Sequence, residues 1–159
     1  NLYMVKKMFN IALYQPDIPQ NTAAIIRLCS CFNATLEIIE PCGFHLNDKR
    51  LKKVAMDYLD KSKIITYKSY ESFKLKKKNS RIILMTTKAK KNYCNFKFKF
   101  KDTILFGRES AGVPKHVHAD SYKRLKIPLV KNFRSLNVSI AASITLAEAL
   151  RQNMVFKND

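Results

Sequence analysis

Apolar residues recur along the chain in short runs that alternate with longer segments of helical period. Six runs read as strands, at residues 9–14, 36–40, 63–67, 81–87, 103–106 and 125–130. The helical segments are residues 46–59, 70–75, about 136–156, and one that Asn21 or Thr22 can cap and that runs to about residue 32. Strands alternating with helices predict an α/β domain with a mostly parallel sheet.

Two further segments have patterns of their own. Residues 95–101, NFKFKFK, alternate Phe with Lys, which predicts a half-exposed strand or an extended arm with the rings under a lysine-covered face. The last helix is apolar and small-residue-rich around its whole circumference. A terminal helix on one sheet should keep a polar face, so this helix is expected to have a second partner. We expect a homodimer with a two-fold contact through it.

The net charge of +18 indicates which kind of molecule the protein binds. Residues 45–101 hold 18 Lys and Arg against 4 Asp and Glu, so +14 of the total lies in about a third of the chain. Such a surface favours a polyanion, and nucleic acid rather than a membrane, because the longest charge-free stretch (residues 135–147) is shorter than the ~20 residues of a spanning helix. The alternative is that the lysines only solvate the surface.

A chain of 159 residues is expected to form one domain, residues 1–159. Met4 and Met8 are both candidate start residues, which leaves residues 1–3 as a candidate vector-derived stretch. The N-terminus lacks a secretory pattern, so we expect a cytoplasmic protein. The four cysteines form no CxxC pair and are expected to be reduced thiols, without a metal.

The three glycines exclude two common nucleotide-binding devices. Gly43, Gly107 and Gly112 can build neither GxGxxG nor the GxxxxGK of a P-loop. His116 and His118 are expected in a surface loop rather than at a metal. Three segments remain as candidates for a functional site: PQNTAAIIR from Pro19, LFGRESAGVP from Leu105, and KIPLVKNFRSLNVSIA from Lys126.

These three segments resemble the SPOUT methyltransferases. Three further segments extend the resemblance over almost the whole chain: IIEPCGF, DKRLKKVAMDYLD and LMTTKA. The closest likeness is to their single-domain tRNA ribose 2′-O-methyltransferases, the TrmL or YibK-like group. The resemblance implies a deep C-terminal trefoil knot whose loops hold S-adenosylmethionine, with S-adenosylhomocysteine as product and no metal. It also implies a homodimer that binds the anticodon stem-loop of tRNA and methylates the wobble ribose.

By position, the resemblance also implies the site. The residues expected to bind the cofactor are Met85, Thr86, Gly107, Glu109, Ile127, Leu129, Ser135 and Leu136. The expected catalytic residues are Arg27, Asn21 and Asn137, with Arg27 reaching the cofactor near the partner chain. A guanidinium is always protonated, so we favour an electrostatic clamp over a general base for Arg27. The structural alternatives are a surface arginine at 27 and a plain helix cap at Asn21.

Two other functions stay open on the sequence alone. One is a non-catalytic RNA-binding or ribosome-associated protein that keeps the knot. The other is a knotted methyltransferase that acts on ribosomal RNA, or on a base rather than a ribose.

Overall fold

The computed structural model describes residues 8–55, 58 and 63–153, which build one parallel sheet between two layers of helices. Its seven strands lie in the order β3-β2-β1-β6-β4-β7-β5, and every pairing is parallel. The strands are β1 (Asn10–Tyr14), β2 (Thr35–Ile39), β3 (Ile64–Tyr67), β4 (Ile82–Met85), β5 (Lys91–Asn92), β6 (Thr103–Phe106) and β7 (Lys123–Lys126). The predicted α/β class with a parallel sheet is confirmed.

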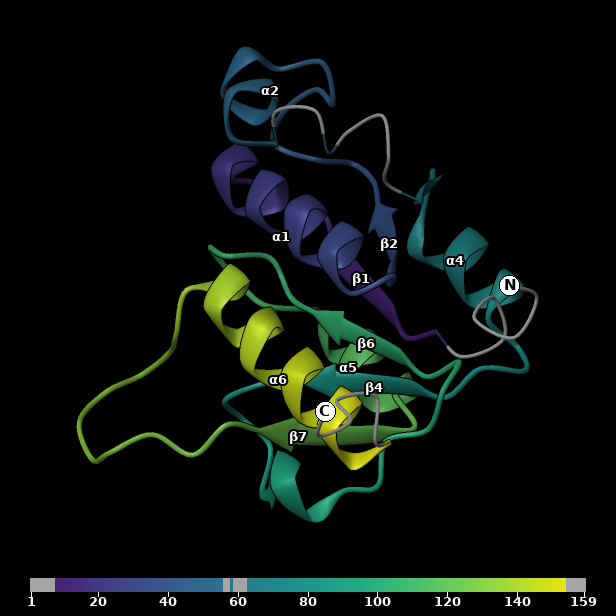
Figure 1. Ribbon diagram of the computed structural model, residues 1–159. Helices are drawn as coiled ribbons and strands as arrows, with labels where there is room; N and C mark the ends of the chain where they lie inside the picture. The colour runs from purple at the N-terminus through teal and green to yellow at the C-terminus, as the bar shows by residue number, and fades with distance from the viewer. Residues whose placement is uncertain (1–7, 56–57, 59–62, 154–159) are drawn as a thin grey trace, which may run out of the picture.

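Five α-helices and one 3₁₀ turn connect the strands in the described part of the chain (Figure 1). α1 (Pro19–Cys31), α2 (Lys49–Ala55) and α6 (Val138–Gln152) lie on one side of the sheet. α4 (Tyr70–Lys76) and α5 (Lys115–Asp120) pack on the other side, and η1 (Tyr93–Asn95) follows β5. No helix in this part of the chain is long and apolar enough to cross a membrane.

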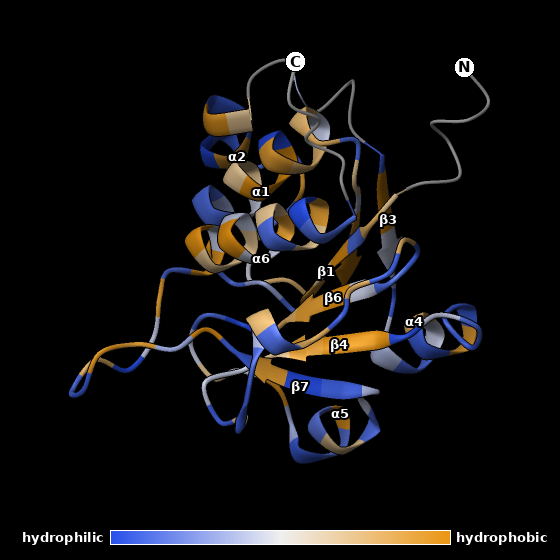
Figure 2. Cartoon of the chain, turned by 60° about the horizontal axis from the view of Figure 1, so that its bottom comes forward, coloured by the Kyte–Doolittle hydropathy of each residue, from blue (hydrophilic) through white to orange (hydrophobic). Residues whose placement is uncertain are grey.

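The two cores follow directly from the alternation of side chains along each strand. In β6, Ile104 and Phe106 point into the core shared with α1 and α6, while Leu105 points into the core shared with α4 and α5. β4 divides in the same way. Both faces of the central strands are therefore apolar, as Figure 2 shows for β1, β4 and β6, and this is typical of a parallel sheet covered by helices.

Two predicted helix starts are wrong. α1 begins at Pro19 with Ile18 at its N-cap, so neither Asn21 nor Thr22 caps it. Proline suits the first helical turn, because its fixed φ matches the helix and its missing N–H would have no partner there. α2 begins at Lys49 rather than at residue 46. At this start, the Asp48 side chain accepts a hydrogen bond from the backbone N–H of Arg50 at 2.8 Å. The end of this helix at residue 59 lies outside the described residues.

Three other predictions differ from the structure. β7 spans Lys123–Lys126 and not residues 125–130, because Pro128 has no N–H to donate to a ladder. His116 and His118 lie in helix α5 rather than in a loop. Residues 96–99 follow η1 without forming a strand, which corresponds to the arm that the alternation also allowed, and Phe96 and Phe98 are buried as expected. The strand from residue 81 ends at Met85. The trefoil knot stays a prediction.

Candidate active site

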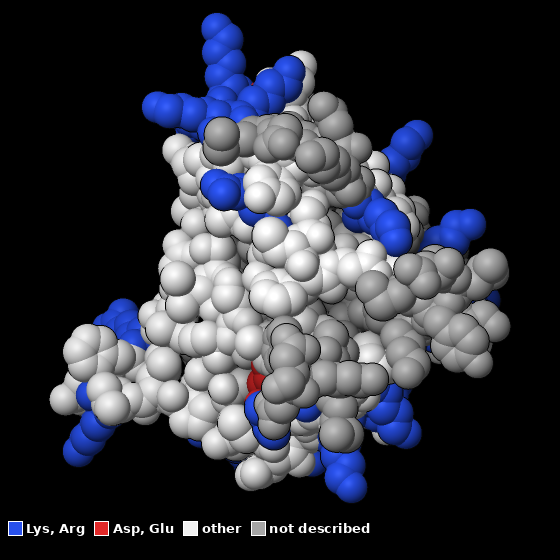
Figure 3. All heavy atoms as spheres, viewed as in Figure 1, with Lys and Arg blue, Asp and Glu red and all other residues white. Residues whose placement is uncertain are grey.

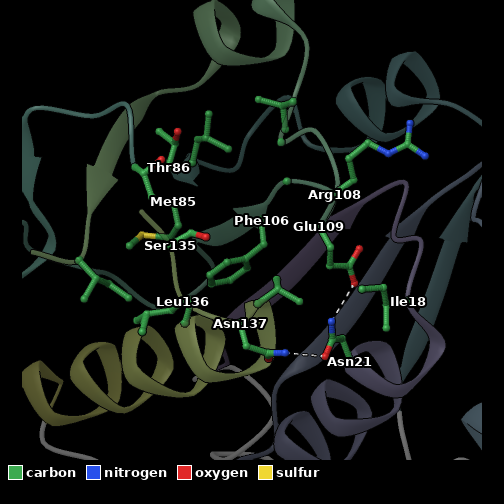
Figure 4. A pocket seen from close by; sticks show the side chains of 18 of the residues that line it. Ile18, Asn21, Met85, Thr86, Phe106, Arg108, Glu109, Ser135, Leu136 and Asn137 are labelled. Carbon is green, nitrogen blue, oxygen red and sulfur yellow. Dashed lines mark hydrogen bonds between the residues drawn. The ribbon is translucent and has the colours of Figure 1, made fainter. Parts of the chain in front are cut away.

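A cavity of about 440 Å³ opens at the carboxyl ends of β4, β6 and β7 and at the start of α6 (Figure 4). Ligands of open parallel sheets bind at this edge. The residues predicted at this site that line the cavity are Asn21, Met85, Thr86, Gly107, Glu109, Ile127, Leu129, Ser135, Leu136 and Asn137. The structure thus brings together every residue predicted to bind the cofactor and two of the three predicted to be catalytic.

The turn that follows β6 explains why glycine is needed at two positions. A Cβ on Gly107 would lie 2.7 Å from the backbone of Gly112, so the two glycines let the turn close on itself. Arg108 and Gly112 exchange backbone hydrogen bonds of 3.0 and 2.8 Å, and Gly112 has a φ of +65°. This tight turn holds Glu109 at the rim of the cavity.

A directional chain of side-chain hydrogen bonds joins three elements at one end of the cavity (Figure 4). The Asn137 side chain is the N-cap of α6, because its Oδ1 accepts from the backbone N–H of Ser139 at 2.9 Å. Its Nδ2 therefore faces outward and donates to Oδ1 of Asn21 at 2.9 Å, and Nδ2 of Asn21 donates to Oε1 of Glu109 at 3.4 Å. The helix cap thus orients both amides and makes Glu109 the final acceptor.

Glu109 belongs to a pair of carboxyl groups. Its Oε2 accepts from the backbone N–H of Asp17 at 3.0 Å, and the Asp17 carboxylate accepts from the Ser110 hydroxyl. Burial, followed by the Asp17 side chain, raises the pKa of Glu109 above its ordinary value. The pKa of Asp17 is lowered by its contact with Glu109, with Ser110 and Arg108 acting in the same direction. The two carboxyl groups therefore influence each other's protonation, and Arg108, whose Nε lies 3.8 Å from Oδ2 of Asp17, offsets part of their negative charge.

Arg27 does not reach this cavity in its own chain. It lies exposed on α1, where Nη1 is 3.5 Å from the carbonyl oxygen of Val54 and the guanidinium is 5.0 Å from the centre of the Tyr58 ring. The residue predicted to be catalytic therefore faces α2 and away from Glu109.

Several residues of this site were not predicted, and Phe106 and Asp17 are two of them. Phe106 ends β6 and lines the cavity, and strict alternation from Ile104 along the strand could have identified it. Asp17 contacts Glu109 through its backbone N–H. No pattern in the sequence signals its contact with Glu109, because 92 positions separate them.

The lining suits a ligand with one apolar and one polar end. The side chains of Met85, Phe106 and Leu136 form apolar walls, while the Asn21, Glu109 and Asn137 groups lie together at one end. No group of three or more His, Cys, Asp or Glu that could hold a metal occurs among the residues described. A mostly apolar cavity with a few convergent polar groups defines a small-molecule site in an α/β domain.

The chain belongs to the SpoU rRNA Methylase family, whose model matches residues 8–147. It is therefore an RNA methyltransferase, and the comparisons with individual proteins narrow the group. Over 144 residues it is 46% identical to a tRNA (cytidine(34)-2′-O)-methyltransferase of Beijerinckia indica, with 89% of this chain and 90% of the relative covered. It is 36% identical over 147 residues to the protein of the same name from Escherichia coli K12, covering 91% and 94% of the two chains.

The solved structures agree with this assignment. One, described as giving structural insights into the 2-OH methylation of C/U34 on tRNA, superposes with a TM-score of 0.90 at 31% identity. The likeness covers 94% of this chain and 99% of that one. The resemblance inferred from the motifs is thus confirmed.

Proposed function

We propose that this protein methylates the ribose 2′-hydroxyl of the wobble cytidine or uridine in the anticodon loop of tRNA, with S-adenosylmethionine as donor. The observation that carries the proposal is the meeting of all eight predicted cofactor-binding residues around one cavity at adjacent strand ends. The named activity of relatives that align over about nine-tenths of both chains supports the substrate.

The residues of the cavity fit such a donor. Ile127, Leu129 and Leu136 offer apolar surface for the faces of a purine ring, and the turn from Gly107 to Gly112 offers backbone groups for its edge. The sulfonium supplies an activated methyl group. The protein has to align that methyl with the ribose oxygen and exclude water, which makes positioning the main contribution of this chain.

The polar end of the cavity is where we place the ribose. Asn21 and Asn137 are held in one orientation by the cap of α6, so their amide groups are arranged before substrate binds. Pre-arranged dipoles stabilise the charge that develops on a reacting oxygen without having to reorient. Glu109 holds Asn21 in place from the other side.

We further propose a homodimer through α6 that brings Arg27 of the partner subunit to this end of the cavity. Figure 3 shows an uncharged surface over α1 and α6, with Lys and Arg gathered around it. Ile140 on α6 is 50% exposed, and Ile18 and Leu136, which also line the cavity, are 41% and 36% exposed. Exposed apolar residues support a two-fold contact, and a guanidinium from the partner would add a second positive charge to a cavity that Arg108 already lines.

A subunit-mixing experiment tests the shared site. Arg27→Ala homodimers and Asn137→Asp homodimers should each be nearly inactive on tRNA. Mixing and reannealing the two should restore up to about a quarter of wild-type turnover per dimer, because one site in the mixed dimer has both residues intact. Mixtures as inactive as their parents would contradict catalysis by the partner's Arg27.

A second experiment tests the donor and the substrate. Calorimetry should give saturable binding of S-adenosylhomocysteine, which Arg27→Ala leaves unchanged. Mapping 2′-O-methylated nucleotides in tRNA and ribosomal RNA after reaction should mark position 34 of tRNA. Methylation elsewhere would favour another RNA target, and absent donor binding would favour a non-catalytic RNA-binding protein.

A third experiment tests the basic surface. Replacing Lys88, Lys90 and Lys91, which follow β4 near the cavity, should weaken tRNA binding and flatten its dependence on salt, since each lost phosphate contact lowers the slope by roughly 0.7–0.9. Unchanged affinity would place the RNA on another face.

A further inference from the structure

The segment between β7 and α6 projects from the body of the molecule and ends in an exposed tip (Figures 1 and 2). We call residues 130–134 the tip. Val130 and Phe133 are 73% and 72% exposed, which makes them the most exposed large apolar side chains in the part of the chain that the structure describes. Large apolar side chains are normally removed from water, so an exposed pair on a projecting loop indicates a binding surface.

The tip is a formed turn. The N–H of Phe133 donates to the carbonyl oxygen of Val130 at 3.3 Å, and Asn132 between them has a φ of +76°. A positive φ at the third residue is the geometry of a type II turn, for which Asn is one of the favoured residues. The turn therefore presents the Phe133 ring at a defined place.

The charge around the ring points to the class of partner. From Ser121 to Ala147 the chain carries five Lys and Arg and no Asp or Glu. Lys131 and Arg134 flank the ring and are exposed, and neither is ion-paired within the described residues. An exposed aromatic ring between free cations fits single-stranded nucleic acid, whose bases stack on rings while its phosphates meet the cations.

The tip lies next to the reaction site. Ser135 and Leu136 line the cavity, and Phe133 is two residues before Ser135. Two residues span at most about 7 Å between Cα atoms, so the backbone of Phe133 lies within that distance of a residue that lines the cavity.

We propose that Phe133 stacks on an unpaired nucleobase adjacent to the methylated nucleotide, with Lys131 and Arg134 on the flanking phosphates. This inference rests on the proposed function, since it needs an RNA substrate with unstacked bases. It makes Phe133 a substrate-positioning residue that selects loops over duplex. Two other occupants, the second subunit and the methyl donor, are outcomes of the tests below.

The chain contains no tryptophan, so Phe133→Trp introduces a single fluorescent reporter at the tip. Its emission should be quenched on titration with an anticodon stem-loop RNA and should change little with a duplex RNA of the same length. Quenching by S-adenosylhomocysteine alone would show that the tip closes on the donor. Emission that is insensitive to stem-loop RNA would also overturn the proposal.

Substitution gives the second test. Phe133→Ala and Phe133→Leu should both weaken stem-loop binding about tenfold, which corresponds to about 1.4 kcal/mol, while Phe133→Tyr retains it. Leu75→Ala is the matched control, because Leu75 is 64% exposed on α4, on the other side of the sheet. If Phe133→Leu binds like wild type, the contact is not stacking and the proposal fails.

Two further readouts separate this inference from the proposed function. Sedimentation should give the same mass for Phe133→Ala and wild type, and a loss of dimer would assign the tip to the second subunit. Wild-type protein that transfers no methyl to tRNA would sink the proposed function. Normal transfer by Phe133→Ala at subsaturating RNA would sink only the role of the ring.

Discussion

The two ends of the sheet carry polar clusters of opposite character. At the amino ends of β4 and β6, Asp102 is 2% exposed and accepts two hydrogen bonds from Arg81, at 2.7 and 2.6 Å, and one from the backbone N–H of Lys99 at 2.8 Å. Arg81 also donates to the carbonyl oxygen of Lys97. This pair closes a corner of the fold, and its hydrogen-bonding capacity is largely used.

At the carboxyl ends, the cluster of Asp17, Asn21, Glu109 and Asn137 leaves capacity unused. The Asn21–Glu109 bond is long at 3.4 Å, and Oδ1 of Asp17 is buried with no partner among the described residues. Unsatisfied polar groups cost stability, and they persist where a site needs them for a ligand. The fully hydrogen-bonded Arg81–Asp102 pair thus stabilises the fold, whereas the incompletely bonded cluster beside the cavity marks the binding site.

The largest expected effect on stability comes from removing the Arg81–Asp102 ion pair. Arg81→Ala leaves the Asp102 carboxylate buried without its partner and should lower the free energy of unfolding by about 3–5 kcal/mol. Urea denaturation measures this, and binding of S-adenosylhomocysteine below the transition should be unaffected. The control is Arg50→Ala, which removes an exposed pair with Asp48 and should leave the unfolding curve unchanged. Equal curves for both variants would refute the contrast.

A substitution in the cluster at the carboxyl ends should have the opposite effect, with a large loss of turnover and little loss of stability. Asn137→Asp keeps the oxygen that caps α6 but loses the N–H that orients Asn21, so turnover should fall about 100-fold, or about 2.7 kcal/mol, with stability near wild type. Asn137→Ala loses both and should also cost about 1 kcal/mol of stability. Single-turnover methylation and urea denaturation separate the two. If turnover follows stability in both variants, the cluster is structural only.

The sequence predicts the strands and the cavity well, because each depends on local pattern. Strand ends in a parallel sheet share one edge, so Gly107 after β6 and Ile127 after β7 lie at the same cavity, whereas Ser135 was placed there by the family resemblance. The arrangement of Asn21 was not predictable in this way. Its role depends on α1 starting at Pro19 and on an amide 116 positions away.

Two other features depend on contacts that no local pattern encodes. Arg27 is predicted from the motif, but its direction away from its own cavity follows from the packing of α1 against α2. Asp17 meets Glu109 only once the loops after β1 and β6 lie side by side, which is a consequence of the β1–β6 pairing.

The smallest expected effect is on the pH dependence of catalysis, and it tests the role of the Asp17–Glu109 pair. Asn21 donates to the Glu109 carboxylate, so kcat/KM should fall as pH decreases through the raised pKa of Glu109. Burial is the main cause of that raised pKa and Asp17 the second. Asp17→Asn removes the negative neighbour, which lowers the pKa of Glu109 and should move the acid limb of the profile to lower pH.

A matched variant controls for charge alone. The Asp48 side chain is 19% exposed, and its hydrogen bonds with Arg50 lower its pKa to about 2, so Asp48→Asn changes net charge equally without contact with Glu109. Its acid limb should coincide with that of wild type. A shift to higher pH in Asp17→Asn, or an equal shift in both variants, would mean that the limb does not report Glu109. The polar cluster at the carboxyl ends would then act only as a scaffold, as the one at the amino ends does.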